Sequence, residues 1–187
     1  MNTKRETMQA VRFLALAASV AMSASAQATS RRLVVSIPDR KIALIEDGRV
    51  VKIYPVAVGK PSTPSPRGSF RIASRVQHPT WYQPKKVVGP GPANPLGTRW
   101  MGLGYKGYGI HGTNMPLSIG KAASHGCIRM RNHDVEELFA LVEVGDQVDL
   151  VTEVAPELAK AFRSAGSPAD AQPVQLAALT STHGDAQ

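Results

Sequence analysis

After residue 30 the chain opens with short apolar segments that strong turn signals separate. Residues 32–36, 41–46 and 49–59 are rich in Val, Ile and Leu, which pack well on a pleated surface. Asp47-Gly48 lies between the last two segments, and an Asp-Gly pair readily takes the positive φ angles of a tight hairpin turn. The sequence therefore predicts an antiparallel β opening with little helix.

Strand-like segments continue along the folded region, with one principal helix among them. Residues 132–142 predict that helix, since their apolar side chains fall on one face and Asn132 is suited to cap its start. Four further segments are predicted as strands: residues 70–76, 99–103, 107–111 and 147–151. The expected fold class is therefore mainly β, with one principal helix that follows the only cysteine.

The N-terminus has the organisation of an export signal. Basic residues precede an apolar stretch at 13–22, and residues 24–26 (Ala-Ser-Ala) form an A-x-A cleavage site. A spanning helix needs ~20 apolar residues, whereas this stretch is short and diluted by serines. We predict a signal peptide over 1–26, export to the periplasm or cell envelope, and no membrane span after cleavage. Cleavage after Ala28 and retention as an anchor are the alternatives.

Composition changes at residue 155, where Ala, Ser, Pro, Gln and Thr become dominant. Residues 31–154 are therefore expected to form one domain. Residues 155–187 are expected to be a low-complexity, disordered tail, apart from a short helix at 156–163. Within the domain, residues 79–97 form a long irregular stretch with aromatic and lysine side chains, which either line a substrate groove or anchor the loop to the body.

The chain is basic, with a formal net charge of +8. Such a charge suits an anionic partner, for example the carboxylate-rich peptides of a cell wall. Nucleic acid is not expected, because the chain is predicted to be exported and its basic residues are scattered instead of lying along one helix.

Cys127 is the only cysteine, so no intramolecular disulfide holds the fold. A buried apolar cysteine is one interpretation, but histidines, small residues and glycines surround Cys127 instead of large apolar residues. An unpaired exported thiol also risks oxidation, which favours a functional reason for its presence. A Cys/His nucleophilic site is therefore the preferred hypothesis.

Three histidines are candidates for the base that would serve Cys127. His111 ends a glycine-rich segment, His125 lies two residues before the cysteine, and His133 is more typical of a solvated helix surface. The N–H groups around Gly126 and Cys127 are candidate oxyanion donors, since glycine permits a tight turn there. A zinc site lacks the usual ligand spacing, so no metal and no cofactor are expected.

Five short motifs surround and precede the cysteine. They are residues 63–70 (Thr-Pro-Ser-Pro-Arg-Gly-Ser-Phe), 94–100 (Asn-Pro-Leu-Gly-Thr-Arg-Trp), 108–114 (Tyr-Gly-Ile-His-Gly-Thr-Asn), 118–122 (Ser-Ile-Gly-Lys-Ala) and 124–130 (Ser-His-Gly-Cys-Ile-Arg-Met). Together they resemble the L,D-transpeptidase (YkuD-type) catalytic domain over about residues 32–151. The resemblance implies an L,D-transpeptidase-like β-sandwich, with residues 31–154 as its catalytic domain.

The same resemblance implies acyl transfer on peptidoglycan stem peptides. Cys127 would attack the carbonyl of the third, L-configured residue of a tetrapeptide stem, the terminal D-Ala would leave, and an amine would resolve the acyl-enzyme. His111 would be the general acid/base, and the carbonyl of Gly112 would orient its ring. The N–H groups near His125, Gly126 and Cys127 would bind the oxyanion.

Three further residues are candidates for substrate binding. Ser124 and Asn114 lie within the matching motifs, and Arg129 has a forked guanidinium suited to a substrate carboxylate. Many members of the family carry Asn two residues after the cysteine, where this chain has Arg129. The departure leaves the identity of the acceptor open.

The acceptor is either a second stem, which gives a 3-3 crosslink, or a wall-attached lipoprotein. One alternative is a hydrolase at the same site, either an L,D-carboxypeptidase or an enzyme that cleaves lipoprotein from peptidoglycan. An alternative of another class is a non-catalytic cell-wall-binding domain. The pairing of Cys127 with His111 argues against the last of these, because binding alone needs neither residue.

Overall fold

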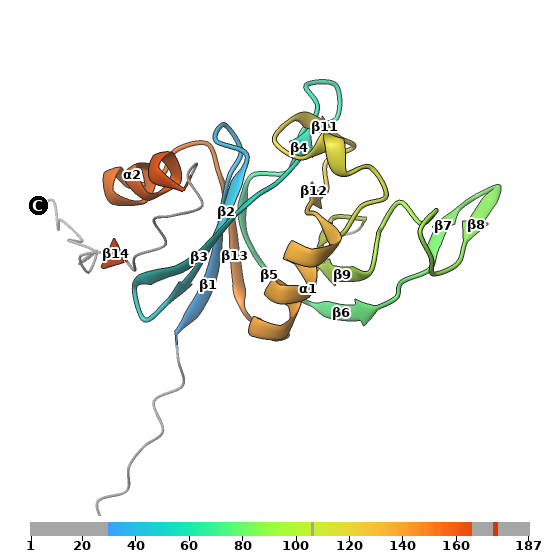
Figure 1. Cartoon of the computed structure of the whole chain (residues 1–187), viewed down its shortest axis with the longest axis horizontal. Coiled ribbons are helices and arrows are strands. Elements are labelled where there is room, and N and C mark those ends of the chain that lie inside the picture. The colour runs from blue at the N-terminus through green and yellow to red at the C-terminus, as the bar shows by residue number, and fades with distance from the viewer. Residues whose placement is uncertain (1–29, 106, 166–173, 176–187) are drawn as a thin grey trace, which may run out of the picture.

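The computed structural model describes residues 30–105, 107–165 and 174–175. The predicted signal peptide and most of the predicted tail lie outside the described residues. The fold is mainly β, as predicted from the sequence, with two α-helices and two larger sheets (Figure 1).

The larger sheet has six strands and contains the β opening that the sequence predicts. Its order is β14 (Val174–Gln175), β3 (Arg49–Pro55), β2 (Lys41–Glu46), β1 (Arg31–Ser36), β13 (Gln147–Val151) and β5 (Gly68–Arg71). Strands β1, β2 and β3 are antiparallel, as expected from the turn at Asp47-Gly48. Strand β13, distant in sequence, pairs with β1 in parallel and brings the end of the domain back beside its beginning.

The second sheet has four strands and carries the histidine and cysteine motifs. Its order is β12 (Ile128–Arg129), β10 (Gly109–His111), β9 (Arg99–Gly102) and β6 (Ser74–Gln77). The expectation of one strand over 70–76 is wrong, because the chain leaves the first sheet after β5 and enters the second with β6. Ile72, at the break, is fully buried in the core. A small parallel pair, β4 (Val58–Gly59) with β11 (Ala122–Ser124), flanks the cysteine turn.

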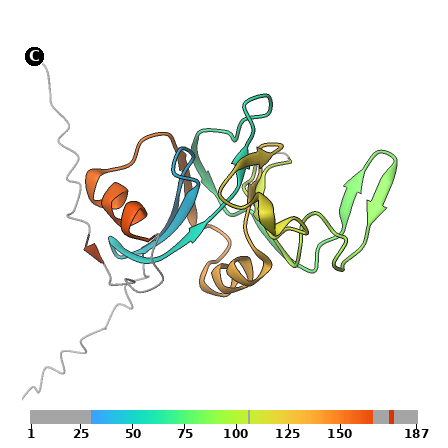
Figure 2. The ribbon, with the colours of Figure 1, turned by 45° about the horizontal axis from the view of Figure 1, so that its top comes forward.

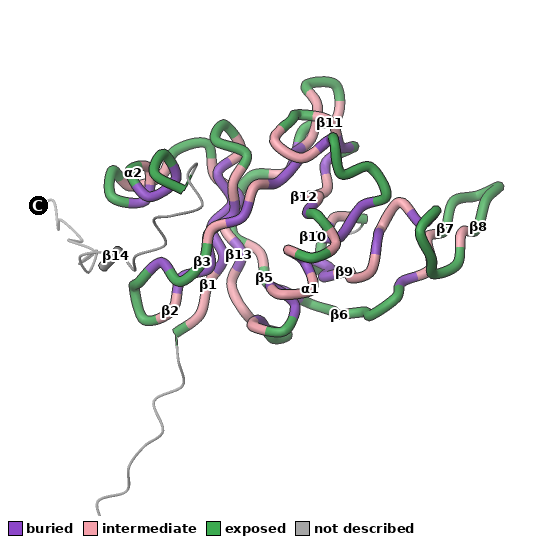
Figure 3. Tube along the Cα trace, viewed as in Figure 1, coloured by how far each residue is buried: buried purple, intermediate pink, exposed green. Residues whose placement is uncertain are grey.

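The main core lies between the two sheets and helix α1 (Asn132–Leu141). Apolar residues of both sheets and of the helix share one cluster, as the buried segments in Figure 3 illustrate: Leu33, Val35, Ile42, Leu44, Met101, Ile110, Ile128, Val135, Leu138 and Val148. Helix α1 begins as the sequence predicts, but its N-cap is Arg131 and no side chain caps it. Asn132 is instead the first helical residue, and its side chain bonds elsewhere.

A second apolar cluster lies on the outer face of the six-stranded sheet, under helix α2 (Pro156–Ser164). Leu158 and Phe162 are buried there and pack against four residues of the sheet: Val34, Ala43, Ile45 and Val50. Helix α2 packs onto the sheet because these two apolar side chains, four residues apart, share one face. The short helix expected at 156–163 matches α2.

The irregular stretch at 79–97 contains a hairpin, β7 (Trp81–Gln83) with β8 (Lys86–Val88), which projects from the body at the end opposite α2 (Figures 1 and 2). The buried Asn94 holds its base, since the amide nitrogen donates to the carbonyls of Pro79, Val88 and Gly89. Within the described residues, no helix is both long and apolar enough to cross a membrane.

Candidate active site

Three adjacent strands of the smaller sheet bring the predicted site residues together. In register, Trp100 of β9 lies beside His111 of β10, and His111 lies beside Arg129 of β12. The neighbouring residues Ile110 and Ile128 point into the core. Because side chains alternate across a strand, His111 and Arg129 project from the opposite face of the sheet, next to Cys127, which immediately precedes β12.

The ring of His111 is held from two sides. Its Nδ1 lies 2.5 Å from the carbonyl oxygen of Gly112, and its ring stacks on Trp100 with centroids 5.7 Å apart and an interplanar angle of 26°. A carbonyl only accepts hydrogen bonds, so Nδ1 carries the proton and donates it. In the neutral ring, Nε2 is then left with a lone pair, which is the tautomer that a general base needs.

Burial keeps that ring neutral. His111 is only 4% exposed. Desolvation, aided by the nearby charge of Arg129 and opposed by the hydrogen bond to Gly112, lowers the pKa of His111 to about 4. At neutral pH His111 is therefore an uncharged base.

The thiol of Cys127 is likewise neutral at rest. Its Sγ donates to the carbonyl of Gly107 at 3.4 Å. Burial raises the pKa of the Cys127 thiol, while a hydrogen bond from the backbone of Gly109 and the charge of Arg129 act in the opposite direction. The site thus holds a neutral thiol and a neutral imidazole. Proton transfer would accompany nucleophilic attack instead of preceding it.

The turn before the cysteine is shaped by Gly126. Its φ is +110°, and an added Cβ would lie 2.5 Å from Cε1 of Tyr108, so glycine is required both for the backbone angle and for the contact. The buried Ser124 fixes this turn: its hydroxyl accepts from the Gly126 N–H at 3.0 Å and donates to the Cys127 carbonyl at 2.5 Å.

This bond revises the expected oxyanion site. The N–H of Gly126 was among the predicted donors, but it is already bonded to Ser124. Among residues 30–105 and 107–165, no acceptor is found for the N–H groups of His125 and Cys127. These two N–H groups are therefore the ones left to bind an oxyanion.

The other predicted site residues differ in how close they lie to Cys127 and His111. The His125 side chain is exposed, and that of Arg129 is partly buried beside His111 and Cys127. Asn114 is exposed, and its amide nitrogen donates to the carbonyl of Ala93 at 3.0 Å, so it ties two loops together.

Two residues near the site were not predicted from the sequence. Trp100 stacks on the His111 ring. The only sequence signal for this residue is its place in the 94–100 motif. Asn132, expected to cap α1, instead accepts from the N–H groups of Thr98 and Thr113. In the described part of the chain, no cluster of three or more His, Cys, Asp or Glu residues is placed to hold a metal ion.

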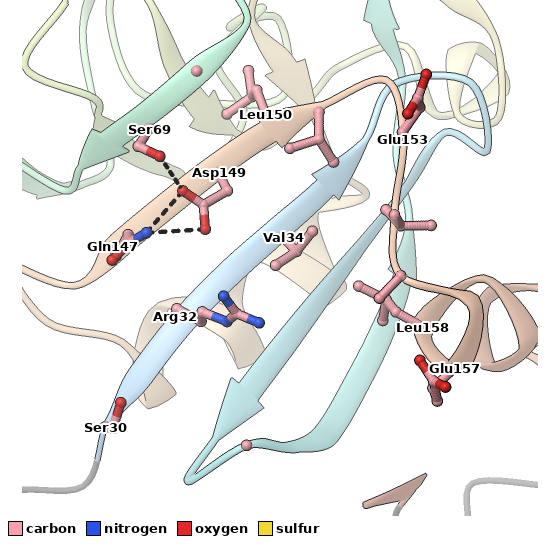
Figure 4. Close-up of a pocket in the computed structure, with 15 residues that line it drawn as sticks. Ser30, Arg32, Val34, Ser69, Gln147, Asp149, Leu150, Glu153, Glu157 and Leu158 are labelled. Atoms are coloured by element: carbon pink, nitrogen blue, oxygen red, sulfur yellow. Dashed lines mark hydrogen bonds between the residues drawn. The ribbon is translucent and has the colours of Figure 1, made fainter. Parts of the chain in front are cut away.

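A cavity of about 670 Å³ lies elsewhere, on the outer face of the six-stranded sheet beside α2 (Figure 4). Arg32 and Asp149 line it, and the carboxylate of Asp149 accepts from Ser69 Oγ at 2.6 Å and from Gln147 Nε2 at 2.9 Å. Neither His111 nor Cys127 lines this cavity. The candidate active site is therefore the cysteine turn, where Cys127 and His111 lie.

Comparison with known proteins shows the family to which this chain is similar. A profile of the YkuD family, described as the L,D-transpeptidase catalytic domain, matches residues 30–150. The protein named L,D-transpeptidase YkuD from Bacillus licheniformis is 46% identical over 119 residues, which are 64% of this chain and 64% of that protein. The protein named L,D-transpeptidase YqjB from Bacillus subtilis is 41% identical over 126 residues, which are 65% of this chain and 70% of that protein.

Solved structures share the fold. The Ldtfm–avibactam carbamoyl enzyme superposes with a TM-score of 0.57 at 26% identity, covering 67% of this chain and 50% of that one. An L,D-transpeptidase from Mycobacterium smegmatis gives a TM-score of 0.56 at 21% identity, covering 66% and 59%. The resemblance seen in the motifs and the fold expected from it are thereby confirmed.

Proposed function

Because the chain belongs to the L,D-transpeptidase catalytic-domain family, we propose that it is an exported cysteine acyltransferase acting on peptidoglycan tetrapeptide stems. One observation carries the proposal. His111, with its Nδ1 bound to the Gly112 carbonyl, presents a basic Nε2 on the strand next to Cys127.

In the acylation half, Sγ of Cys127 attacks the carbonyl carbon of the third stem residue, and the thiol proton passes to Nε2 of His111. The carbonyl oxygen becomes an oxyanion, for which the N–H groups of His125 and Cys127 are the available donors. The tetrahedral intermediate then collapses. The bond to the terminal D-Ala nitrogen breaks, Nε2 returns the proton to that nitrogen, and a thioester on Cys127 remains.

The second half uses the same groups in reverse roles. An acceptor amine gives its proton to Nε2 of His111 as it attacks the thioester carbon, and the sulfur of Cys127 leaves and is reprotonated. The Gly112 carbonyl stabilises the imidazolium formed in each half through the bond from Nδ1, as the third member of a triad does.

Charge supports an anionic peptide as substrate. Arg129 lies beside both His111 and Cys127, and no carboxylate of the described residues pairs with it. Its guanidinium is thus free to bind a stem carboxylate bidentately. The net charge of +8 favours approach to an acidic wall. The acceptor is a second stem, giving a 3-3 crosslink, or a wall-attached lipoprotein.

Mass spectrometry with a defined tetrapeptide-stem muropeptide tests the proposal. We expect a thioester adduct on Cys127, loss of D-Ala and, with a second stem present, a crosslinked dimer. Tripeptide alone, even with acceptor in excess, would indicate the hydrolytic alternative. A folded protein with a reduced thiol that gives neither adduct nor product would overturn the proposed stem chemistry.

A further inference from the structure

Asn132 lies between two loops that meet beside the His111 ring. Its Oδ1 accepts from the N–H of Thr113 at 3.1 Å and from the N–H of Thr98 at 3.3 Å. The side chain is partly buried at the start of α1, and α1 packs into the main core. One oxygen on a rigid helix therefore fixes two loop segments that are distant from it in sequence.

The approach of Asn132 is so close that only glycines fit opposite it. A Cβ added to Gly112 would lie 2.2 Å from Oδ1 of Asn132, and one added to Gly97 would lie 2.1 Å from it. No residue other than glycine can be placed at either position without moving this amide. The two glycines are thus explained by contact with Asn132.

The Thr113 N–H belongs to the same peptide unit as the carbonyl that orients the base. The Gly112 carbonyl accepts from Nδ1 of His111 at 2.5 Å, and the amide at the other end of that peptide bond donates to Asn132. Because hydrogen bonds hold both its carbonyl and its N–H, this peptide plane cannot rotate relative to the residues on either side. Donation by its N–H also polarises its carbonyl, which strengthens the bond that the carbonyl accepts.

We propose that Asn132 is a positioning residue that acts on His111 through the Gly112–Thr113 peptide, locking the tautomer with the proton on Nδ1. The inference rests on the proposed function for its consequence in catalysis, but the tautomer itself is a property of the resting protein. Removing the Asn132 oxygen frees the peptide plane, so the Nδ1-protonated form loses its preferred acceptor and the Nε2-protonated form, which cannot act as the base, gains population.

Only the acceptor oxygen of Asn132 carries this role. Within the described part of the chain, its amide nitrogen donates no hydrogen bond. Asn132→Asp keeps an acceptor of the same shape in the same place, and the N-terminus of α1 favours a negative charge there. Asn132→Ala removes the acceptor and leaves the helix intact.

Asn94 provides a matched control. It is also an amide whose Oδ1 accepts a backbone N–H, that of Leu96 at 2.8 Å, and it joins loop segments that precede β9. It is not bonded to the Gly112–Thr113 peptide. Asn94→Ala therefore reproduces the loss of a loop-holding amide without touching the orienting carbonyl.

The test is long-range ¹H–¹⁵N correlation NMR of the labelled full chain at pH 7, with the His111 signal assigned through His111→Gln. We expect the Nδ1-protonated tautomer in the wild type, in Asn132→Asp and in Asn94→Ala, and a mixture of tautomers in Asn132→Ala. In turnover of the stem muropeptide, Asn132→Ala should lose about ten- to a hundredfold in kcat, by analogy with residues that orient the histidine ligands of metals, with little change in KM.

Two results separate this inference from the proposed function. A folded Asn132→Ala protein with the wild-type tautomer would overturn the positioning role, whether or not kcat falls. A tautomer that shifts in Asn132→Ala while the wild type releases no D-Ala would support the positioning role and overturn the proposed function alone. If Asn132→Ala does not fold, Asn132→Ser, whose hydroxyl is held farther from Thr113, gives the same comparison.

Discussion

Each of the two larger sheets has one face that points away from their shared core, and these two outer faces differ in character. Part of the outer face of the six-stranded sheet is apolar, and α2 covers that part with Leu158 and Phe162. The corresponding face of the four-stranded sheet carries Trp100, His111 and Arg129 in one row, next to Cys127. The apolar region under α2 is closed by packing, whereas the row beside Cys127 presents reactive and polar groups.

The difference teaches how this fold separates stability from chemistry. Burying apolar side chains under α2 contributes free energy of folding. Burying His111 and Cys127 beside a charged Arg129 has a cost, since desolvation acts against the charged form of each. We expect substitutions on the two faces to have opposite signatures in activity and in stability.

The largest effect is expected on the site face, from Cys127→Ala. Turnover of a stem muropeptide should fall by at least about 10⁴-fold, as when the nucleophile of a covalent mechanism is removed. The free energy of unfolding should change by less than about 1 kcal/mol, because a small, partly exposed side chain is shortened by one atom. Product analysis and urea unfolding measure the two quantities. Residual turnover within tenfold of the wild type would mean that the chemistry does not depend on Cys127.

The opposite signature is expected from Phe162→Ala under α2. Phe162 is 1% exposed, and truncation of a buried Phe costs about 3–5 kcal/mol. Turnover per folded molecule should stay within about twofold of the wild type, because no residue of the site contacts this cluster. Urea unfolding and active-site titration by thiol alkylation test this. Val51→Ala, an exposed apolar truncation on the same sheet, is the control and should change stability by less than about 0.5 kcal/mol.

The third effect concerns pH and arises from the buried base. The pKa of His111 is lowered to about 4 in the folded protein, against about 6.5 in the unfolded chain. Between these values the unfolded chain binds more protons, so the free energy of unfolding falls as pH falls. The contribution is fully present above about pH 6.5 and lost below about pH 4. Its size is about 3 kcal/mol.

His111→Gln isolates that contribution, since glutamine does not titrate. Urea unfolding at pH 7.5 and at pH 4.5 should show a steeper loss of stability in the wild type than in the variant, and carboxylates contribute equally to both. Parallel loss in the two proteins would mean that His111 is not held neutral by burial.

Much of this architecture could be predicted because its signals are local. The hairpin at Asp47-Gly48 and the face of α1 depend on residues close together in sequence, and both are present in the structure. The neighbourhood of His111 and Cys127 also followed from short motifs. The structure adds the parallel pairing of β10 with β12, which motif spacing alone does not define.

The failures have a common physical origin in long-range contact. The alternation over 70–76 fits either sheet, so the break at Ile72 depends on a core assembled from elsewhere. Asn132 has the sequence signature of a cap, but Gly97 and Gly112 approach its oxygen from distant loops. The Gly126 N–H was expected to face the substrate, and the hydroxyl of Ser124 takes it instead. Each outcome depends on a partner that sequence spacing does not reveal.

The smallest effect tests why the site face is rich in glycine. In Gly109→Ala, the new Cβ would lie 2.6 Å from Cη2 of Trp100 and 2.7 Å from the carbonyl oxygen of Met101. Backbone cannot yield easily, so Trp100 must move, and overpacking of this kind costs about 1–3 kcal/mol. Because Trp100 stacks on His111, turnover should fall as well.

Gly89→Ala is the matched control, since nothing lies within 4 Å of its added Cβ and its φ is not positive. It should leave stability within about 0.5 kcal/mol of the wild type. The fluorescence of Trp100, measured with and without Gly109→Ala in a Trp81→Phe background, reports whether the indole moves. A Gly109→Ala protein with unchanged fluorescence, stability and turnover would mean that this face tolerates added bulk and that close packing of Trp100 is not required. A coupled loss of stability and turnover would show that close packing of Trp100 is part of what holds the base in place.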